Sequence, residues 1–387
     1  MTLLTETKSI LNDLIAFPTV SSESNLALIQ YASDQLTALG ADVFFDYDET
    51  GKKANLFATL GPEIDGGIVL SGHTDVVPVA GQNWSADPFL MREKDGLLYG
   101  RGSCDMKGFI AACLAVAPLY ASLDLKRPLH FAFSYDEEIG CLGAERLVEV
   151  LKQRNIKPAV AIIGEPTNMR VMEGHKGCYD YTTEFTGLEG HASNPLVGVN
   201  AVEYAVRYIS RLMELGEDLK TRAPEGSRFQ PPWTTLQVGR IEGGQAHNII
   251  AGHCTVDWEM RPVQSGDAAY VKDNIREYCD NDLLPAMQAV SEQASIKTTV
   301  IAEVVGLEPV AENEAKQIVS ELTGAHEHEC GVVAFGTEAG LFQEMGMTAV
   351  VCGPGSIEQA HKPDEYVSLA QLQSCLDMLV KLGDKLV

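Results

Sequence analysis

Five polar side chains lie where apolar stretches end or glycine-rich turns begin, and their types are those of metal ligands. They are two histidines and three carboxylates: His73, Asp105, Glu138, Glu165 and His361. In the segment 68–75 (IVLSGHTD) the apolar half predicts a buried strand, so the polar half would reach the rim of a sheet. Ligands bind at that rim in open α/β folds. Such residues suit a pair of Zn²⁺ ions, and Co²⁺ or Mn²⁺ would also fit.

Taken singly, most of these residues have a simpler explanation. Asp75 lies two positions after His73, so in an extended segment it could orient the imidazole, but the pair could also be an ordinary turn. Asp105 lies at a turn that opens a helix, where a carboxylate can act as an N-cap. Its neighbour Cys104 is expected to pack rather than to bind metal. His361, in a loop, could be a surface histidine. Only the set as a whole indicates a metal centre.

The SYDEE segment gives the sharpest chemical indication. Glu137 and Glu138 follow Asp136 directly after the apolar segment 129–134, so three carboxylates would repel one another at one strand end. We therefore expect a cation among them. Since adjacent side chains diverge, one glutamate can bind metal while the other acts as a general base in the cleft. The alternative is a solvated acidic loop.

The elements that must position these residues alternate between helix and strand up to about residue 180. The patterns predict helices at 3–16, 24–39, 107–120 and 142–154, and strands at 54–60, 68–71, 129–134 and 159–163. Strands separated by helices imply a parallel sheet with both faces covered. We therefore expect the ligands at one edge of one sheet.

Between about 180 and 290 the pattern changes to alternating segments, which are typical of antiparallel strands with one solvated face. After 290 a parallel-type pattern returns, starting with TTVIAEV, and helices are expected at 312–323, 337–345 and from 368. The sequence thus predicts an α/β fold with a mostly parallel sheet sandwiched by helices. Its catalytic, metal-binding domain would comprise 1–179 and 292–387. A smaller α+β domain with an antiparallel sheet, for dimerisation or as a lid, would be inserted at 180–291.

The composition of the chain indicates which classes of ligand the protein can bind and in which compartment it lies. The 387-residue chain is long enough for two domains, and its net charge of −25 disfavours nucleic acid and anionic membranes and favours a cationic or zwitterionic small molecule. No apolar run reaches the roughly 18–20 residues that span a bilayer, and the N-terminal segment lacks the features of a signal peptide. Nine cysteines without CxxC pairs predict a reducing, cytoplasmic setting. Nucleotide-binding loops and a GxSxG elbow are both lacking.

Seven motifs together resemble the dinuclear-zinc deacylase and exopeptidase family, which includes aminoacylases, glutamate-releasing carboxypeptidases and desuccinylases. The motifs are SGHTDVVP, GRGSCDMKG, DEE, GEPT, HKG, GHAS and AHKPDEY, in this order from about residue 68 to 366. The resemblance implies two zinc ions that share a bridging carboxylate. One ion would be held by His73, Asp105 and Glu165, and the other by Asp105, Glu138 and His361.

The same resemblance implies the catalytic residues. Glu137 would be the general base toward a metal-activated water, and Asp75 would orient His73. The peptide bond between Asp105 and Met106 is expected to be cis, as is usual in the family.

Three residues of the inserted domain also match family positions. His191, in GHAS, is similar to the histidine that reaches a neighbouring active site in family homodimers and helps to stabilise the oxyanion. Asn248 and Arg261 match positions that contact a substrate carboxylate. Each has a plain structural alternative: a surface turn for His191, a turn for Asn248, and for Arg261 an ion pair with Glu259 or a nearby acid.

Within the family, the segments around GEPT, HKG and GPGSIEQAHKPDEY look most like the branch that hydrolyses N2-acetyl-L-ornithine to ornithine and acetate in arginine biosynthesis. Desuccinylases carry GTSDGR, whose arginine grips an extra carboxylate, whereas this chain reads GTEAGL. Glu338 and Leu341 at these positions favour a cationic substrate side chain, unless Glu338 serves a helix N-terminus. A desuccinylase, a broad N-acyl-amino-acid hydrolase, a dipeptidase and a noncatalytic metal-binding relative are the rival interpretations.

Overall fold

The structure, a computed structural model, describes residues 2–326 and 329–387, and the chain folds into two compact units. The large unit comprises the chain up to Gly174, together with Pro309–Val332 and Thr337–Val387. The small unit comprises His175–Glu308 and Val333–Gly336. Within the described residues, no helix is long and apolar enough to cross a membrane.

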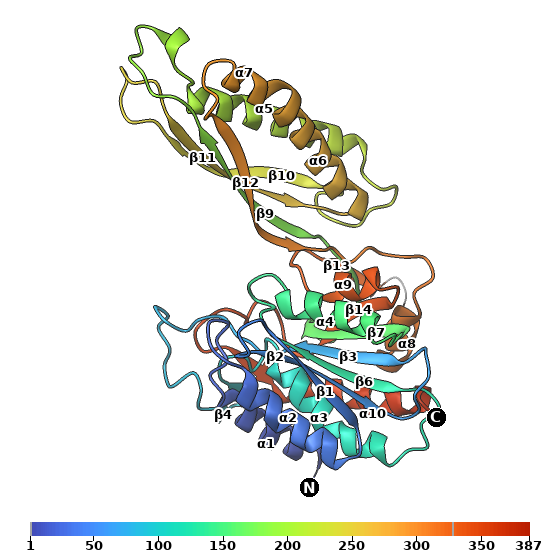
Figure 1. Cartoon of the computed structure of the whole chain (residues 1–387). Helices are drawn as coiled ribbons and strands as arrows, with labels where there is room; N and C mark the ends of the chain where they lie inside the picture. The colour runs from blue at the N-terminus through green and yellow to red at the C-terminus, as the bar shows by residue number, and fades with distance from the viewer. Residues whose placement is uncertain (1, 327–328) are drawn as a thin grey trace. The chain divides into compact units, whose positions relative to one another are not determined.

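An eight-stranded sheet forms the centre of the large unit (Figure 1). Its order is β1 (Asp42–Tyr47), β2 (Ala54–Leu60), β6 (Leu129–Ser134), β3 (Ile68–His73), β7 (Val160–Pro166), β14 (Thr348–Gly353), β8 (Met172–His175) and β13 (Gly331–Val333). The four strands β6, β3, β7 and β14 run parallel, whereas β1, β2 and β8 pair antiparallel to their neighbours. The parallel strands therefore end at one edge of the sheet.

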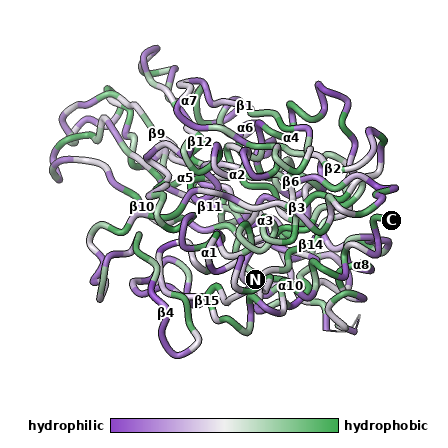
Figure 2. Tube along the Cα trace, turned by 90° about the horizontal axis from the view of Figure 1, so that it is seen from below, coloured by the Kyte–Doolittle hydropathy of each residue, from purple (hydrophilic) through white to green (hydrophobic). Residues whose placement is uncertain are grey.

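Helices cover both faces of this sheet (Figure 1). On one face pack α1 (Leu3–Ile15), α2 (Leu26–Ala38), α3 (Lys107–Ala121) and α10 (Leu369–Leu382), and on the other α4 (Leu142–Gln153) and α9 (Ala339–Glu344), while α8 (Glu314–Thr323) contacts β14 and α10. Every residue of β3 and β6 is buried, as expected for strands covered on both faces. Figure 2 shows hydrophobic colouring along α3, which lies in this core.

A three-stranded sheet joins two loops of the large unit. It consists of β4 (Arg92–Lys94), β5 (Leu97–Tyr99) and β15 (Tyr366–Ser368), and β15 runs antiparallel to β5. The loop that follows β5 and the segment that precedes β15 therefore lie side by side. These are the segments that carry Asp105 and His361.

The small unit has a four-stranded antiparallel sheet in the order β10 (Thr235–Gly243), β11 (His253–Arg261), β9 (Cys178–Thr186) and β12 (Ser295–Val304). Buried residues alternate along β9 and β11, because only one face is covered. The helices α5 (Ala201–Thr221) and α6 (Ser265–Tyr278) supply the cover, and a short α7 (Leu284–Gln288) follows.

The fold class is confirmed, but β12 corrects one prediction. We placed TTVIAEV in the parallel-type domain and ended the inserted domain at 291. In the structure this segment pairs antiparallel with β9, so the small unit extends to Glu308. The apolar run misled because Val300 and Ile301 are 56% and 61% exposed rather than buried on a core strand. The antiparallel edge strand β1 was also missed.

Candidate metal centre

The five predicted ligands meet at the carboxyl edge of the parallel strands. His73 is the last residue of β3, and Glu165 is the last but one of β7. Glu138 follows β6, and Asp105 lies just before α3. His361 lies in the loop between β14 and β15, with a left-handed backbone of φ 62°. Parallel topology thus brings together residues that are far apart in sequence.

Asp105 faces two histidines, one with each carboxylate oxygen. Its Oδ1 lies 2.9 Å from Nε2 of His73, and its Oδ2 lies 3.2 Å from Nε2 of His361. Oε1 of Glu165 lies 3.5 Å from the same nitrogen of His73, and Oε2 of Glu138 lies 3.0 Å from that of His361. The side chains therefore form two triplets that share Asp105.

These separations fit metal binding. Ligand atoms about 2.0–2.1 Å from a tetrahedral zinc ion lie roughly 3.3 Å apart, and the four distances between a histidine nitrogen and a carboxylate oxygen are 2.9–3.5 Å. Oε1 of Glu138 and Oε1 of Glu165 are buried without a hydrogen-bond partner among the described residues. Because unsatisfied buried carboxylate oxygens are costly, a cation that they coordinate would stabilise the site.

The electrostatics of the triplets favour positive charge. Burial opposes ionisation of Asp105, yet hydrogen bonds from His361 and His73 hold its pKa well below the ordinary value. Burial lowers the pKa of His73, but the carboxylates of Glu165 and Asp105 outweigh it and raise that pKa well above the ordinary value. Hydrogen bonds to Asp105 and Glu138 raise the pKa of His361 to about 10. Divalent cations bound among these carboxylates would supply the same positive charge.

Glu137 lies beside the triplets with a shielded carboxylate. It falls within one group of possible metal-binding side chains together with His73 and Glu165. Burial raises its pKa well above the ordinary value, and Glu138 adds to the effect while His73 opposes it. A carboxylate with a raised pKa accepts a proton more readily near neutral pH, which suits a general base.

Asp75 contacts both His73 and the backbone of the two glutamates. Its Oδ1 accepts from the backbone N–H of Glu137 at 3.1 Å, and its Oδ2 lies 3.4 Å from that of Glu138. Nδ1 of His73 lies 2.9 Å from the backbone carbonyl of Asp75 but 3.6 Å from its carboxylate. Ser21, not singled out from the sequence, donates to Oδ2 of Asp75 at 2.7 Å. Both the carbonyl and the carboxylate of Asp75 thus face Nδ1 of His73, and its role in orienting the imidazole stays a prediction.

The third acid of the SYDEE segment is already paired. Both carboxylate oxygens of Asp136 lie 2.6 Å from Nζ of Lys53, which also donates to the carbonyl of Ser21. The backbone of Asp136 is left-handed, with φ 54°. Only Glu137 and Glu138 therefore remain for the metal centre, and the predicted crowd of three carboxylates is reduced to two.

Glu338 lies in the interior, which differs from the predicted contact with substrate. It is 1% exposed, and its two oxygens accept hydrogen bonds from Ser71 at 2.5 Å and Ser134 at 2.7 Å. Glu338 is also the N-cap residue of α9, so its position agrees with the helix-terminus alternative, although its side chain caps no backbone N–H there. Two serines on neighbouring strands occupy this carboxylate because β3 and β6 pair in parallel register. No local pattern indicated these two serines as its partners.

The predicted loop residues of the small unit are exposed to solvent. His191 and Asn248 are exposed, and their loops are joined because the N–H of Ala192 donates to the carbonyl of Asn248 at 3.0 Å. Nδ1 of His191 accepts the backbone N–H of Ser193 at 3.2 Å. In the neutral imidazole the proton then lies on Nε2, which can donate outward.

Arg261 is held by its neighbour on β11. Its Nε and Nη2 lie 3.1 and 2.7 Å from Oε2 of Glu259. This is the ion pair that the sequence offered as the alternative to substrate binding. The side chain remains about one third exposed, so the pair does not bury the guanidinium.

The peptide bond between Asp105 and Met106 is cis, as the family resemblance implied. A model of the Peptidase family M20/M25/M40 matches residues 69–385. The chain belongs to this family. Membership in the M20/M25/M40 peptidases makes amide-bond hydrolysis the class of reaction, in agreement with the chemistry predicted from the motifs.

Several relatives within this family align with nearly the full length of the chain. The acetylornithine deacetylase of Pasteurella multocida (strain Pm70) is 34% identical over 376 residues, which cover 95% of this chain and 95% of that protein. The acetylornithine deacetylase of Myxococcus xanthus is 37% identical over 388 residues, with coverage of 97% and 96%. Among solved structures, aminopeptidase PepT from Bacillus cereus ATCC 10987 has the same fold, with a TM-score of 0.72 at 19% identity and coverage of 99% and 98%.

Proposed function

We propose that this protein hydrolyses N2-acetyl-L-ornithine to L-ornithine and acetate, a step that supplies ornithine for arginine biosynthesis. The observation that carries the proposal is Asp105 between two histidines, each with a further glutamate, and Glu137 beside them. The names of the full-length M20/M25/M40 relatives support the choice of acyl amino acid. The net charge of −25 also favours a cationic substrate.

Different residues of the chain would bind the metal ions, transfer the proton and position the base. Each triplet would hold one divalent ion, Zn²⁺ in our proposal with Co²⁺ as the alternative, and the bound ions would supply acidification of a water and polarisation of the acetyl carbonyl. Glu137 takes the proton of the attacking water and delivers it to the departing amine. Asp75 fixes the backbone of Glu137 and so aims its carboxylate.

The small unit would bind and orient the substrate. The Nε2–H of His191 donates to the developing oxyanion, and we infer that it does so in the active site of a second copy. Asn248 and Arg261 contact the α-carboxylate, for which Arg261 exchanges its bond with Glu259. Exposure of all three side chains supports this assignment.

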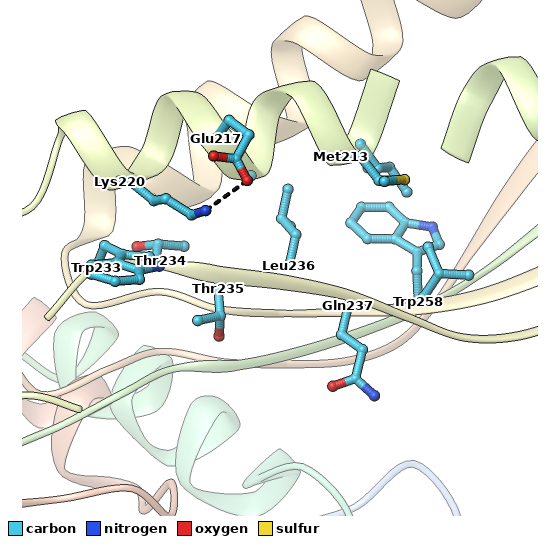
Figure 3. Close-up of a pocket in the computed structure, with 12 residues that line it drawn as sticks. Met213, Glu217, Lys220, Trp233, Thr234, Thr235, Leu236, Gln237 and Trp258 are labelled. Atoms are coloured by element: carbon cyan, nitrogen blue, oxygen red, sulfur yellow. Dashed lines mark hydrogen bonds and ion pairs between the residues drawn. The ribbon is translucent and has the colours of Figure 1, made fainter. Parts of the chain in front are cut away.

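A homodimer through the small unit supplies the second copy. The strand β10 lies at the edge of its sheet, so one row of backbone groups is open to another chain. On α5, Val206 and Met213 are 50% and 67% exposed. A groove of about 290 Å³ lies between α5 and β10, with Met213, Leu236 and Trp258 in its lining (Figure 3). Light scattering coupled to size-exclusion chromatography tests the dimer.

We infer the cell compartment from the cysteines. Cys113, Cys352 and Cys375 are buried free thiols in the core of the large unit. Burial raises the pKa of all three, which keeps them unreactive. We therefore place the enzyme in the reducing cytoplasm.

A substrate panel tests the proposed reaction. We expect the highest kcat/KM for N2-acetyl-L-ornithine, with N-acetyl-L-methionine and N-succinyl-L,L-diaminopimelate roughly 10- to 100-fold lower, since one charged contact is worth about 1.5–3 kcal/mol. A higher value for the succinyl compound would assign a desuccinylase, and similar values for the two acetyl compounds a broad acylase. Turnover that is lost on chelation and restored by Zn²⁺ excludes a noncatalytic relative.

A further inference from the structure

Glu365 lies beneath the loop that carries the shared ligand Asp105. It is 1% exposed, and its Oε1 accepts the backbone N–H groups of Cys104 at 2.8 Å and Asp105 at 3.0 Å. Its Oε2 accepts the N–H of Gly102 at 3.0 Å. A buried carboxylate therefore holds three backbone donors of one turn, and charge-assisted bonds of this kind are stronger than neutral ones.

Arg101 extends the same contacts to the other ligand loop. Its side chain is also 1% exposed, and its Nη1 lies 2.7 Å from Oε2 of Glu365. Its Nη2 donates to Oε1 of Gln82 at 2.6 Å, and Nε2 of Gln82 donates to the carbonyl of His361 at 2.9 Å. The guanidinium also stacks over the ring of Trp84, 4.9 Å from its centroid. Planar, multiply bonded geometry of this kind requires arginine rather than lysine.

The contacts join two ligands that no regular element connects. Asp105 precedes α3, and His361 lies in a loop, half exposed and with a strained backbone. The three-stranded sheet brings the segments together, since the N–H of Gly100 donates to the carbonyl of Glu365 at 3.0 Å. Glu365 and Arg101 then fix the turn of Asp105 and the backbone of His361 from one buried ion pair.

We propose that Glu365 and Arg101 are positioning residues that set the metal affinity of the triplet Asp105, Glu138 and His361. The inference rests on the proposed two-metal function. In this triplet two of the three ligands depend on the buried pair, whereas in the other triplet only Asp105 does. Loss of the pair therefore weakens one ion more than the other.

Glu365→Gln tests the proposal. A carboxamide offers one acceptor oxygen, so in either orientation its NH₂ group faces N–H donors of the loop or of Arg101. Zinc titration of chelator-treated full-length protein by calorimetry should show one ion bound roughly 10- to 100-fold more weakly and the other changed far less. With Co²⁺ as the probe, the visible spectrum of the weakened ion should change as well. Arg101→Lys keeps the charge but loses the bond to Gln82, and should weaken the same ion.

Glu173→Gln is the matched control. Glu173 is a buried carboxylate of β8 in the large unit that pairs with Lys316 of α8 at 3.2 Å, and neither residue lies in the loop of Asp105 or of His361. It should lower the melting temperature of the metal-free protein as much as Glu365→Gln does, with both ions bound as before. Equal weakening of both ions, or zinc binding like that of the control, overturns the inference alone. An unaltered protein that binds no divalent ion overturns the proposed function as well.

Discussion

The predicted site residues of the large unit and those of the small unit differ in how deeply they are buried and in how closely they contact one another. In the large unit the ligands are mostly buried at strand ends, and burial and mutual contact shift their pKa values strongly. In the small unit His191 and Asn248 are exposed and Arg261 pairs with Glu259. The large unit thus brings its predicted ligands into mutual contact, whereas the small unit leaves its predicted residues exposed or paired with a neighbour.

The largest expected effect comes from Glu137→Gln in the large unit. The substitution keeps the size of the side chain but removes the base, so turnover should fall by about 10²–10⁴-fold. Zinc content, measured by atomic emission, should remain that of the unaltered protein because the ligands are intact. Near-normal turnover would refute the role of Glu137.

His191→Ala tests whether an exposed residue of the small unit matters to chemistry. Loss of one oxyanion donor should reduce kcat by roughly 10²–10³-fold with zinc content unchanged. The control His253→Ala changes another exposed histidine of the unit and should leave kcat unchanged.

Mixing the Glu137→Gln and His191→Ala proteins sharpens the same prediction. In a mixed dimer, one active site combines an intact Glu137 with an intact His191 from the other copy. Random exchange of subunits should recover roughly a quarter of the unaltered activity. If no activity returns although native mass spectrometry shows mixed dimers, His191 does not act across the dimer.

Acid should destabilise both units through one buried histidine in each. Burial lowers the pKa of His130 in the large unit and of His175 in the small unit from 6.5 to about 4. As pH falls, each imidazole is protonated in the unfolded chain at a higher pH than in the folded protein. The stability that each neutral imidazole contributes is therefore present above pH 6.5 and is lost as pH falls toward 4. Each contributes at most about 3 kcal/mol.

Urea unfolding at pH 7.5 and pH 5 measures this loss. His130→Gln should reduce the acid dependence, whereas exposed His253→Gln should leave it unchanged. An acid dependence that is the same in both variants would assign the loss to other groups.

The smallest effect is expected from Arg261→Gln. Loss of one contact with the substrate carboxylate should raise KM by about 10-fold and leave kcat nearly unchanged. Arg240→Gln, which changes an exposed arginine of β10 paired with Glu242, is the control and should alter neither constant. An unchanged KM for Arg261→Gln would leave its ion pair with Glu259 as its only role.

Local pattern predicted the helices and strands that carry the ligands, because those strands are apolar and their polar ends are short and distinct. Local pattern failed for residues whose environment is set by a partner that is distant in the sequence. The segment of β12 reads as a core strand but pairs with β9 at a sheet edge. Asp136 reads as part of an acidic crowd but pairs with Lys53, 83 residues away. Glu338 reads as a substrate contact but bonds two serines in the interior.

By itself the sequence determined the residue types of the metal centre, their order and their placement after apolar strands. Hydrophobic burial and strand periodicity act over a few residues, so a local pattern suffices for them. Only the tertiary structure decided that each oxygen of Asp105 faces a different histidine and that Asp75 holds the glutamates. It alone joined Glu365 and Arg101 under the two ligand loops. These contacts depend on sheet register and on side chains brought together from distant segments, which no local pattern encodes.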